Sequence, residues 1–105
     1  KIEMYDLAMV IGVLIHIAPK YLPIVYENIY RATRRYILIG EYYSRQPEEV
    51  SYRGYKNKLF KRDFAGEMLD KYTDLRLVDY GFFYHKDESS NLDDITWFLM
   101  EKADI

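Results

Sequence analysis

Apolar residues occur in continuous runs along this chain, and the runs divide it into structural elements. The first run covers residues 7–11 and is bounded by Asp6 and Gly12. A second run covers residues 36–40. Continuous runs, unlike alternating ones, are typical of interior parallel strands that are covered on both faces. Both segments are therefore predicted to be buried parallel strands.

Between these two strands the apolar positions change to helical spacing. Leu22, Val25, Tyr26 and Ile29 recur at i, i+3, i+4 and i+7, which places them on one face of a helix. Proline is tolerated in the first turn, so the helix should begin near Pro23. The arginines at 31, 34 and 35 are expected at its C-terminal end, where cations complement the helix dipole. Strand, helix and strand then form a βαβ unit with parallel strands.

The second half of the chain continues with a connection, a helix and two strands. Residues 43–60 have no clear periodicity, which predicts a long loop of a kind that is usually functional or disordered. A helical stripe runs from Phe64 to Tyr72, and residues 75–84 and 95–102 are predicted to be strands. The connection between these strands is polar and has no helical stripe, so the strands should be antiparallel. The predicted class is α/β, in the order β-α-β-loop-α-β-β with an antiparallel pair at the C-terminal edge.

Composition narrows the classes of partner. The 105 residues are enough for one domain, and 15 basic against 17 acidic residues give a net charge of −2. No basic field exists to hold nucleic acid or an anionic membrane. The absence of Cys excludes disulfides, thiolate nucleophiles and Cys-ligated zinc. The longest apolar run is about half of what a membrane-spanning helix needs. We expect a globular, cytoplasmic domain with no nucleic acid and no membrane as partner.

The order of elements and several motifs resemble the C-terminal half of class I S-adenosylmethionine-dependent methyltransferases. Residues 6–17 (DLAMVIGVLIHI) resemble the family's fourth strand and the following turn, and residues 35–41 its fifth strand. The two C-terminal strands resemble its sixth and seventh. Three motifs resemble, more narrowly, the methylases associated with pseudaminic acid biosynthesis: YRGYK at 52–56, LFKRDFAGEM at 59–68 and DITWF at 94–98. The resemblance implies a Rossmann-like sheet and methyl transfer to a sugar or sugar-linked small molecule.

The resemblance covers only part of such an enzyme. The family's Gly-rich loop and its ribose-binding acid precede the position where this chain starts, and no G-x-G occurs here. Residues 1–105 are therefore expected to form a single partial methyltransferase domain that is inactive alone. S-adenosylmethionine is the cofactor implied for the complete enzyme. The alternative is a non-catalytic fragment that folds by dimerisation and binds no cofactor.

Two candidate groups follow the first strand. The resemblance places Ile11, Gly12 and Val13 beside the cofactor, through backbone and apolar contacts; a strand end with a tight turn is the alternative. His16 could bind substrate or act as a base near neutral pH. It could equally be a histidine that holds the loop through a carbonyl.

Three candidates follow the second strand at its carboxyl end, where open α/β sheets bind ligands. Glu41 could be catalytic by accepting a proton from a sugar hydroxyl or amine. Tyr42 and Tyr43 could bind substrate by stacking on its ring. A polar strand end packed by aromatic residues is the alternative for all three.

The long connection carries five cations between residues 52 and 62 and no acid. Arg53, Tyr55 and Lys58 are its candidates for binding a small anionic substrate, such as a carboxylated or nucleotide-linked sugar. A solvated loop and a nucleic-acid contact are the alternatives, and the net charge argues against the second. The acidic residues at 87, 88, 93 and 94 have no metal-ligand spacing, so no metal site is predicted.

The first strand is expected to be an edge, because its inner neighbour in the family is missing. From Leu7 to Ile11 it has no Lys, Pro or inward charge to block pairing. This pattern predicts a homodimer in which two such edges pair antiparallel into one sheet. Face-to-face stacking of two copies is the alternative.

The first prediction concerns the cofactor. Because the Gly-rich loop and the ribose acid supply most of the family's polar contacts, this chain alone should bind S-adenosylmethionine more weakly than about 1 mM. Isothermal titration calorimetry measures this directly. A dissociation constant in the micromolar range would contradict the prediction.

Overall fold

The computed structural model describes residues 5–52, 57–89 and 94–103, and its centre is a mixed sheet of four strands. The edge strand β1 (Tyr5–Ile11) pairs in parallel with β2 (Thr33–Glu41). Strand β6 (Ile95–Lys102) lies between β2 and β5 (Leu75–Phe83) and is antiparallel to both. The α/β class, the parallel βαβ unit and the antiparallel C-terminal pair are thereby confirmed.

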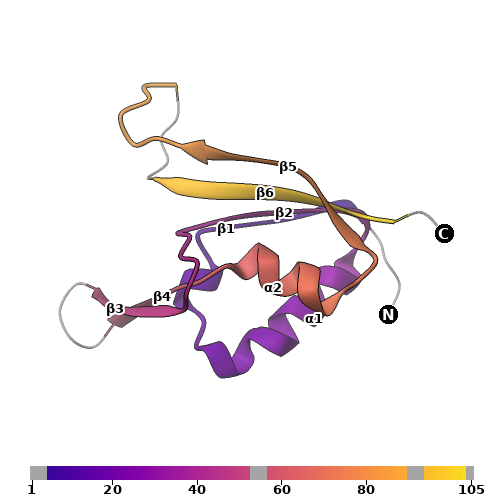
Figure 1. Cartoon of the computed structure of the whole chain (residues 1–105), viewed down its shortest axis with the longest axis horizontal. Helices are drawn as coiled ribbons and strands as arrows, with labels where there is room; N and C mark the ends of the chain where they lie inside the picture. The colour runs from indigo at the N-terminus through magenta and orange to yellow at the C-terminus, as the bar shows by residue number, and fades with distance from the viewer. Residues whose placement is uncertain (1–4, 53–56, 90–93, 104–105) are drawn as a thin grey trace.

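Two helices cover one face of this sheet (Figure 1). They are α1 (Leu22–Ala32) and α2 (Phe64–Lys71), and two 3-10 turns, η1 (Leu14–His16) and η2 (Pro19–Tyr21), precede α1. The predicted stripes form the core, in which Leu22, Tyr26 and Ile29 of α1 are buried together with Phe64 and Met68 of α2. None of the helices in the described ranges is long and apolar enough to cross a membrane.

The first helix ends earlier than predicted. Thr33 is extended, with φ −125° and ψ 149°, and pairs with Tyr5 in the sheet. Its buried hydroxyl donates to the Tyr5 carbonyl at 3.1 Å, and a β-branched residue favours the strand at this point. Arg34 and Arg35 consequently lie in β2 and not at the helix terminus, and they form ion pairs with acidic residues of β1 and β6.

The prediction of an irregular connection over residues 43–60 was wrong, because two paired strands of a β-hairpin lie within it. Strand β3 (Glu48–Tyr52) pairs antiparallel with β4 (Asn57–Lys61) in a separate two-stranded sheet. Val50 and Leu59 are cross-strand partners, and both pack against the core. A single inward pair flanked largely by polar residues gives no recognisable run, so the hairpin escaped the pattern.

The other face of the sheet is covered by no element in the described ranges (Figure 1). On β1, Ala8 and Val10 face the helices, whereas Leu7 and Met9 are 46% and 60% exposed. The prediction that this strand is covered on both faces was therefore wrong for this chain. Although the run of apolar residues in β1 is continuous, only the side chains on one side of the strand pack against the helix layer.

Candidate functional site

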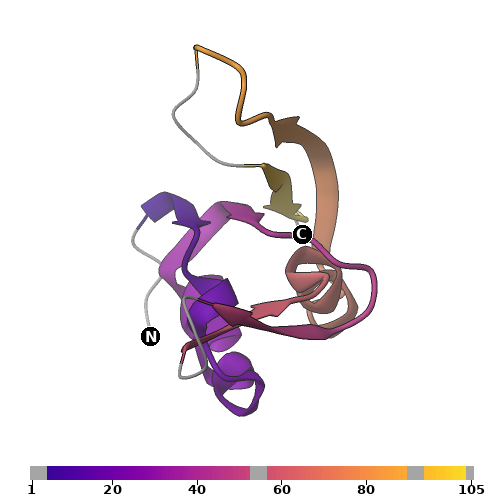
Figure 2. The same ribbon diagram turned by 90° about the vertical axis from the view of Figure 1, so that its left-hand side faces the viewer.

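The carboxyl ends of β1, β2 and β5 meet at one end of the sheet, the end that carries the hairpin (Figure 2). Ligands of open α/β sheets bind at this edge. An open groove of about 640 Å³ lies here between the hairpin and the strand ends. Its lining comes from both sheets and from the β2–β3 and β5–β6 connections: Tyr42, Tyr43, Val50, Ser51, Leu59, Lys61, Phe82, His85, Asp94 and Thr96.

Glu41, the last residue of β2, holds the turn that follows β1. Its carboxylate is 3% exposed and accepts the backbone N–H groups of residues 13, 14 and 15 at 3.1, 3.1 and 3.2 Å. Burial raises the pKa of the Glu41 carboxyl above its usual value, and the N–H groups act in the opposite direction. The carboxylate thus satisfies two donors, of Leu14 and Ile15, that would otherwise be buried without partners, and a third, of Val13, that is part-buried.

This geometry gives Glu41 a positioning role for the turn. Its hydrogen bonds in the described structure all go to backbone, and Glu41 is not among the residues that line the groove. The role as proton acceptor, expected from its place at the strand end, has no support from these contacts. Glu41 therefore affects the carboxyl-end edge of the sheet indirectly, by holding the backbone of the neighbouring turn in place.

The candidate cofactor contacts, Ile11, Gly12 and Val13, form the turn that Glu41 holds. Gly12 has φ +69° and donates its N–H to the Gly40 carbonyl at 2.8 Å. A Cβ added there would meet nothing within 4 Å, so the space beside the turn is open. Val13 is 49% exposed. This turn fits one apolar wall of an S-adenosylmethionine site.

The described residues of this turn do not supply the hydrogen-bonding groups that the polar part of the cofactor needs. An amino acid portion and a ribose need several hydrogen-bonding groups, and the carboxylate that reaches this turn is occupied by backbone N–H groups. Among the described residues, the turn therefore presents apolar and backbone surface and no unoccupied acid. No reaction step is assigned through the cofactor in this chain.

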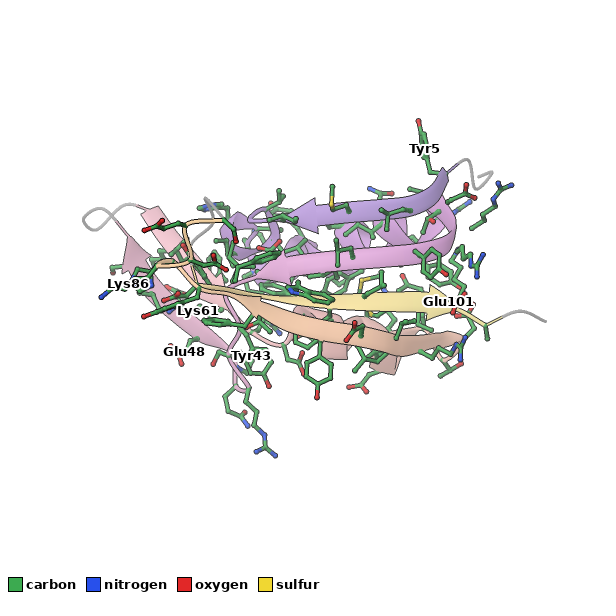
Figure 3. All side chains as sticks on the ribbon, turned by 90° about the horizontal axis from the view of Figure 1, so that it is seen from above. Tyr5, Tyr43, Glu48, Lys61, Lys86 and Glu101 are labelled. Atoms are coloured by element: carbon green, nitrogen blue, oxygen red, sulfur yellow. The ribbon has the colours of Figure 1, made fainter. Side chains whose placement is uncertain are left out.

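Tyr42, Tyr43 and Lys61 come together in the groove. The Lys61 Nζ lies 5.7 Å from the centre of the Tyr42 ring, within range of a cation–π contact. The Tyr43 ring lies 6.0 Å from Phe98 of β6, and Figure 3 places Tyr43 and Lys61 at the same end of the sheet. Lys61 is one of the five cations of this segment, and the sequence does not indicate which of the five faces the strand ends.

The two other described cations of this segment, Lys58 and Arg62, lie outside the groove. Lys58 forms an ion pair with Glu49 across the hairpin at 2.5 Å, and Arg62 pairs with Glu67 of α2 at 2.6 Å. Neither residue lines the groove. Arg53 and Tyr55 lie outside the described residues. The acids that pair with these two cations, Glu49 and Glu67, lie outside residues 52–62, so a count of charges over that segment leaves them out.

Of the two histidines, His85 and not His16 lines the groove. His16 is exposed at the end of η1 and does not line the groove. His85, which lies in the polar β5–β6 connection and belongs to no motif of the sequence, does line it. The His85 Nδ1 lies 2.9 Å from Asp94 Oδ1, which also accepts the His85 backbone N–H at 2.9 Å. These hydrogen bonds hold the pKa of Asp94 below its usual value.

The described residues contain no cluster of three or more His, Asp or Glu side chains that could hold a metal ion. A second charged cluster lies at the opposite end of the sheet, where Glu101 receives Arg35 at 2.9 Å and Arg76 at 2.7 Å. These two guanidinium groups lower the pKa of Glu101. A pocket of about 450 Å³ lies at this end, and each of the two carboxylates that line it, Asp6 and Glu101, pairs with at least one arginine of the same lining.

Comparison with known proteins identifies the fold. No family model matches the sequence, and no curated protein matches it. Among solved structures, the chain is similar to a Burkholderia thailandensis 1,6-didemethyltoxoflavin-N1-methyltransferase with bound 1,6-didemethyltoxoflavin and S-adenosylhomocysteine. The TM-score is 0.69 at 14% sequence identity, over 94% of this chain and 44% of that one.

The chain therefore has a partial Rossmann-like methyltransferase fold, as its motifs predicted. It spans less than half the length of the methyltransferase that it resembles. At this level of identity the likeness establishes the fold alone.

The second prediction concerns the Glu41 carboxylate. Glu41→Ala leaves two buried N–H groups and one part-buried N–H group without their acceptor and should lower the free energy of unfolding by about 3 kcal/mol. Glu41→Gln keeps the size and one acceptor oxygen, and should cost about half as much. Urea denaturation followed by circular dichroism measures both. Glu88→Ala, at an exposed acid, is the control and should be neutral within about 0.5 kcal/mol.

Proposed function

We propose that this chain forms the acceptor-binding part of an S-adenosylmethionine-dependent methyltransferase. The observation that carries the proposal is the groove at the carboxyl ends of the strands, lined by Tyr42, Tyr43 and Lys61, in a chain with a methyltransferase fold. The acceptor is a small anionic molecule, a sugar or sugar-linked compound. Its acidic group would contact the Lys61 ammonium, and its ring would lie against the tyrosine faces.

The Burkholderia enzyme supports the assignment in its general form. Its structure contains S-adenosylhomocysteine and a second small molecule, so a protein of this fold binds a cofactor and an acceptor together. In the complete enzyme that we propose, the cofactor would lie against Ile11, Gly12 and Val13 and would supply an electrophilic methyl group. The acceptor would enter from the hairpin side of the same edge.

The arrangement of the groove suits the demands of methyl transfer on the protein. The reaction needs an acceptor atom held in line with the methyl group, more than it needs strong chemical activation. A point charge at one end of the groove and aromatic faces along it fix position and orientation. The resemblance to methylases associated with pseudaminic acid biosynthesis makes an acidic sugar the first acceptor to test.

The third prediction tests this site with glucuronate as the probe and Lys61→Met as the variant. Losing a charge-assisted hydrogen bond should weaken glucuronate binding by about tenfold or more. Chemical shift perturbation of the ¹⁵N-labelled chain measures the affinity and locates the bound probe. Signals of Tyr42, Tyr43 and Thr96 should move, because these residues line the groove.

Two controls make the result specific. Lys58→Met removes a cation that is already paired with Glu49 outside the groove, so it should leave the affinity within about twofold. Glucose, which has the ring without the carboxylate, should bind more weakly than glucuronate to the unaltered chain and equally weakly to both variants. Equal losses in the two lysine variants would assign the effect to general charge and contradict the site.

A second proposal concerns assembly: two copies of the chain pair through β1. The observation that favours it is the position of β1 at the edge of the sheet, with Leu7 and Met9 exposed on the uncovered face. From Leu7 to Ile11 this edge has no charged residue, and such an apolar edge offers its backbone groups to another strand. Antiparallel pairing about a two-fold axis would satisfy those groups and cover part of the apolar face.

The fourth prediction tests this association by multi-angle light scattering. The unaltered chain should have twice the mass of one copy at low micromolar concentration. Met9→Lys places a charge on the edge strand and should give single copies. Ile24→Lys, on the exposed side of α1 where the side chain is 64% exposed, is the matched control and should leave the mass doubled. A folded unaltered chain with the mass of one copy would refute pairing through β1.

A further inference from the structure

His85 and Asp94 lie at the two ends of the β5–β6 connection and meet at the groove. The antiparallel pairing of Phe83 with Ile95 brings these ends together. One oxygen, Asp94 Oδ1, contacts both the backbone N–H and the ring Nδ1 of His85, each at 2.9 Å. Two contacts from one residue to one oxygen fix the direction of the imidazole ring as well as its position.

The chemistry of the pair determines where the ring carries its proton. The lowered pKa of Asp94 means that its carboxyl is ionised at neutral pH, and an ionised carboxylate only accepts hydrogen bonds. In the neutral imidazole, Nδ1 must therefore carry the hydrogen, and Nε2 has the lone pair. In the described structure, the contacts of His85 involve Nδ1, the backbone N–H and the edge-on Tyr84 ring at 5.0 Å, and none of them uses Nε2.

We propose that His85 is a catalytic residue of the groove and that Asp94 orients it. His85 Nε2 takes a proton from an O–H or N–H group of the bound acceptor. The bond between hydrogen and the acceptor atom breaks, its electron pair stays on that atom, and the proton bonds to Nε2 to give an imidazolium. The acceptor atom is then a better nucleophile toward a methyl donor. This inference rests on the proposed function of the groove.

The setting of the pair distinguishes it from an ordinary surface contact. Both side chains are about half exposed, at 48% and 50%, and an exposed pair contributes little to stability. The titratable residues that line the groove with His85 are Tyr42, Tyr43, Lys61 and Asp94. The Lys61 ammonium would stabilise the anion that proton loss leaves on the acceptor, and the Asp94 carboxylate would stabilise the imidazolium.

The dyad itself is tested on the chain without any ligand. Long-range ¹H–¹⁵N correlation NMR distinguishes the two tautomers of each neutral histidine, and the chain has two histidines, so His16 is an internal reference. His85 should be the Nδ1–H tautomer. Asp94→Asn should lose this preference, whereas Asp87→Asn, in the same connection and bonded to Ser89, should retain it. A His85 in the Nε2–H form in the unaltered chain overturns the dyad.

The proton transfer is tested with 4-hydroxy-3-nitrobenzoate, which combines a carboxylate with a phenol whose ionisation changes its absorbance. Bound to the unaltered chain, the phenol should ionise about one pH unit lower than it does free in solution. His85→Gln should cancel at least half of that shift, Asp94→Asn should reduce it, and Asp87→Asn should leave it unchanged. His85→Gln should keep the affinity within about threefold, because Lys61 holds the carboxylate.

The outcomes separate the two proposals. A reporter that binds in a Lys61-dependent manner but ionises identically with and without His85 overturns the catalytic role and leaves the acceptor site standing. A reporter whose binding does not depend on Lys61 contradicts the acceptor site. In that case the tautomer of His85 still decides whether the dyad exists.

Discussion

The ligand edge of this molecule depends on one carboxylate. Glu41 ends β2 and binds the backbone of the turn that leaves β1, so the ends of two strands are fixed to each other by a buried charge and three N–H donors. That turn continues into η1, which packs against β4 of the hairpin. Strand β4 ends with Lys61, the cation that lines the groove. Glu41 thus links the sheet to the hairpin: it holds the turn that leads into η1, and η1 packs against the strand that carries Lys61.

The helix layer is held by a different device, a polar seam of tyrosines. Tyr26 donates to Glu67 at 2.7 Å and Tyr72 donates to Glu27 at 2.9 Å, while the Tyr30 and Tyr72 rings stack at 4.0 Å. Burial and the adjacent carboxylates raise the pKa of Tyr26, and they raise that of Tyr72 to about 12. Each ring packs as an apolar surface while its hydroxyl reaches an acid. Three of the chain's 12 Tyr thereby join the helix layer through ring packing and hydrogen bonds together.

The sequence determined the elements that bury long apolar faces and missed those that bury little. The strands of the central sheet and both helices follow from runs and stripes that many core contacts enforce. The hairpin buries little more than the Val50–Leu59 pair, so its alternation is too short to recognise. His85 and Asp94 are nine positions apart in a polar connection, and their meeting depends on the register of β5 with β6. Functional side chains that a register brings together have no local pattern in the sequence.

The distribution of charge gives the groove its selectivity. Of the cations clustered in the hairpin segment, those with described positions outside the groove are neutralised by acids of neighbouring elements, and Lys61 remains on the lining. A polyanion such as nucleic acid needs a track of several unpaired cations along its phosphates, which the described part of this edge does not offer. A small molecule needs one acidic group and a ring that fits the tyrosine faces. Local pairing, more than the net charge of −2, is therefore the reason that the acceptor proposed for this edge is a small molecule with one acidic group.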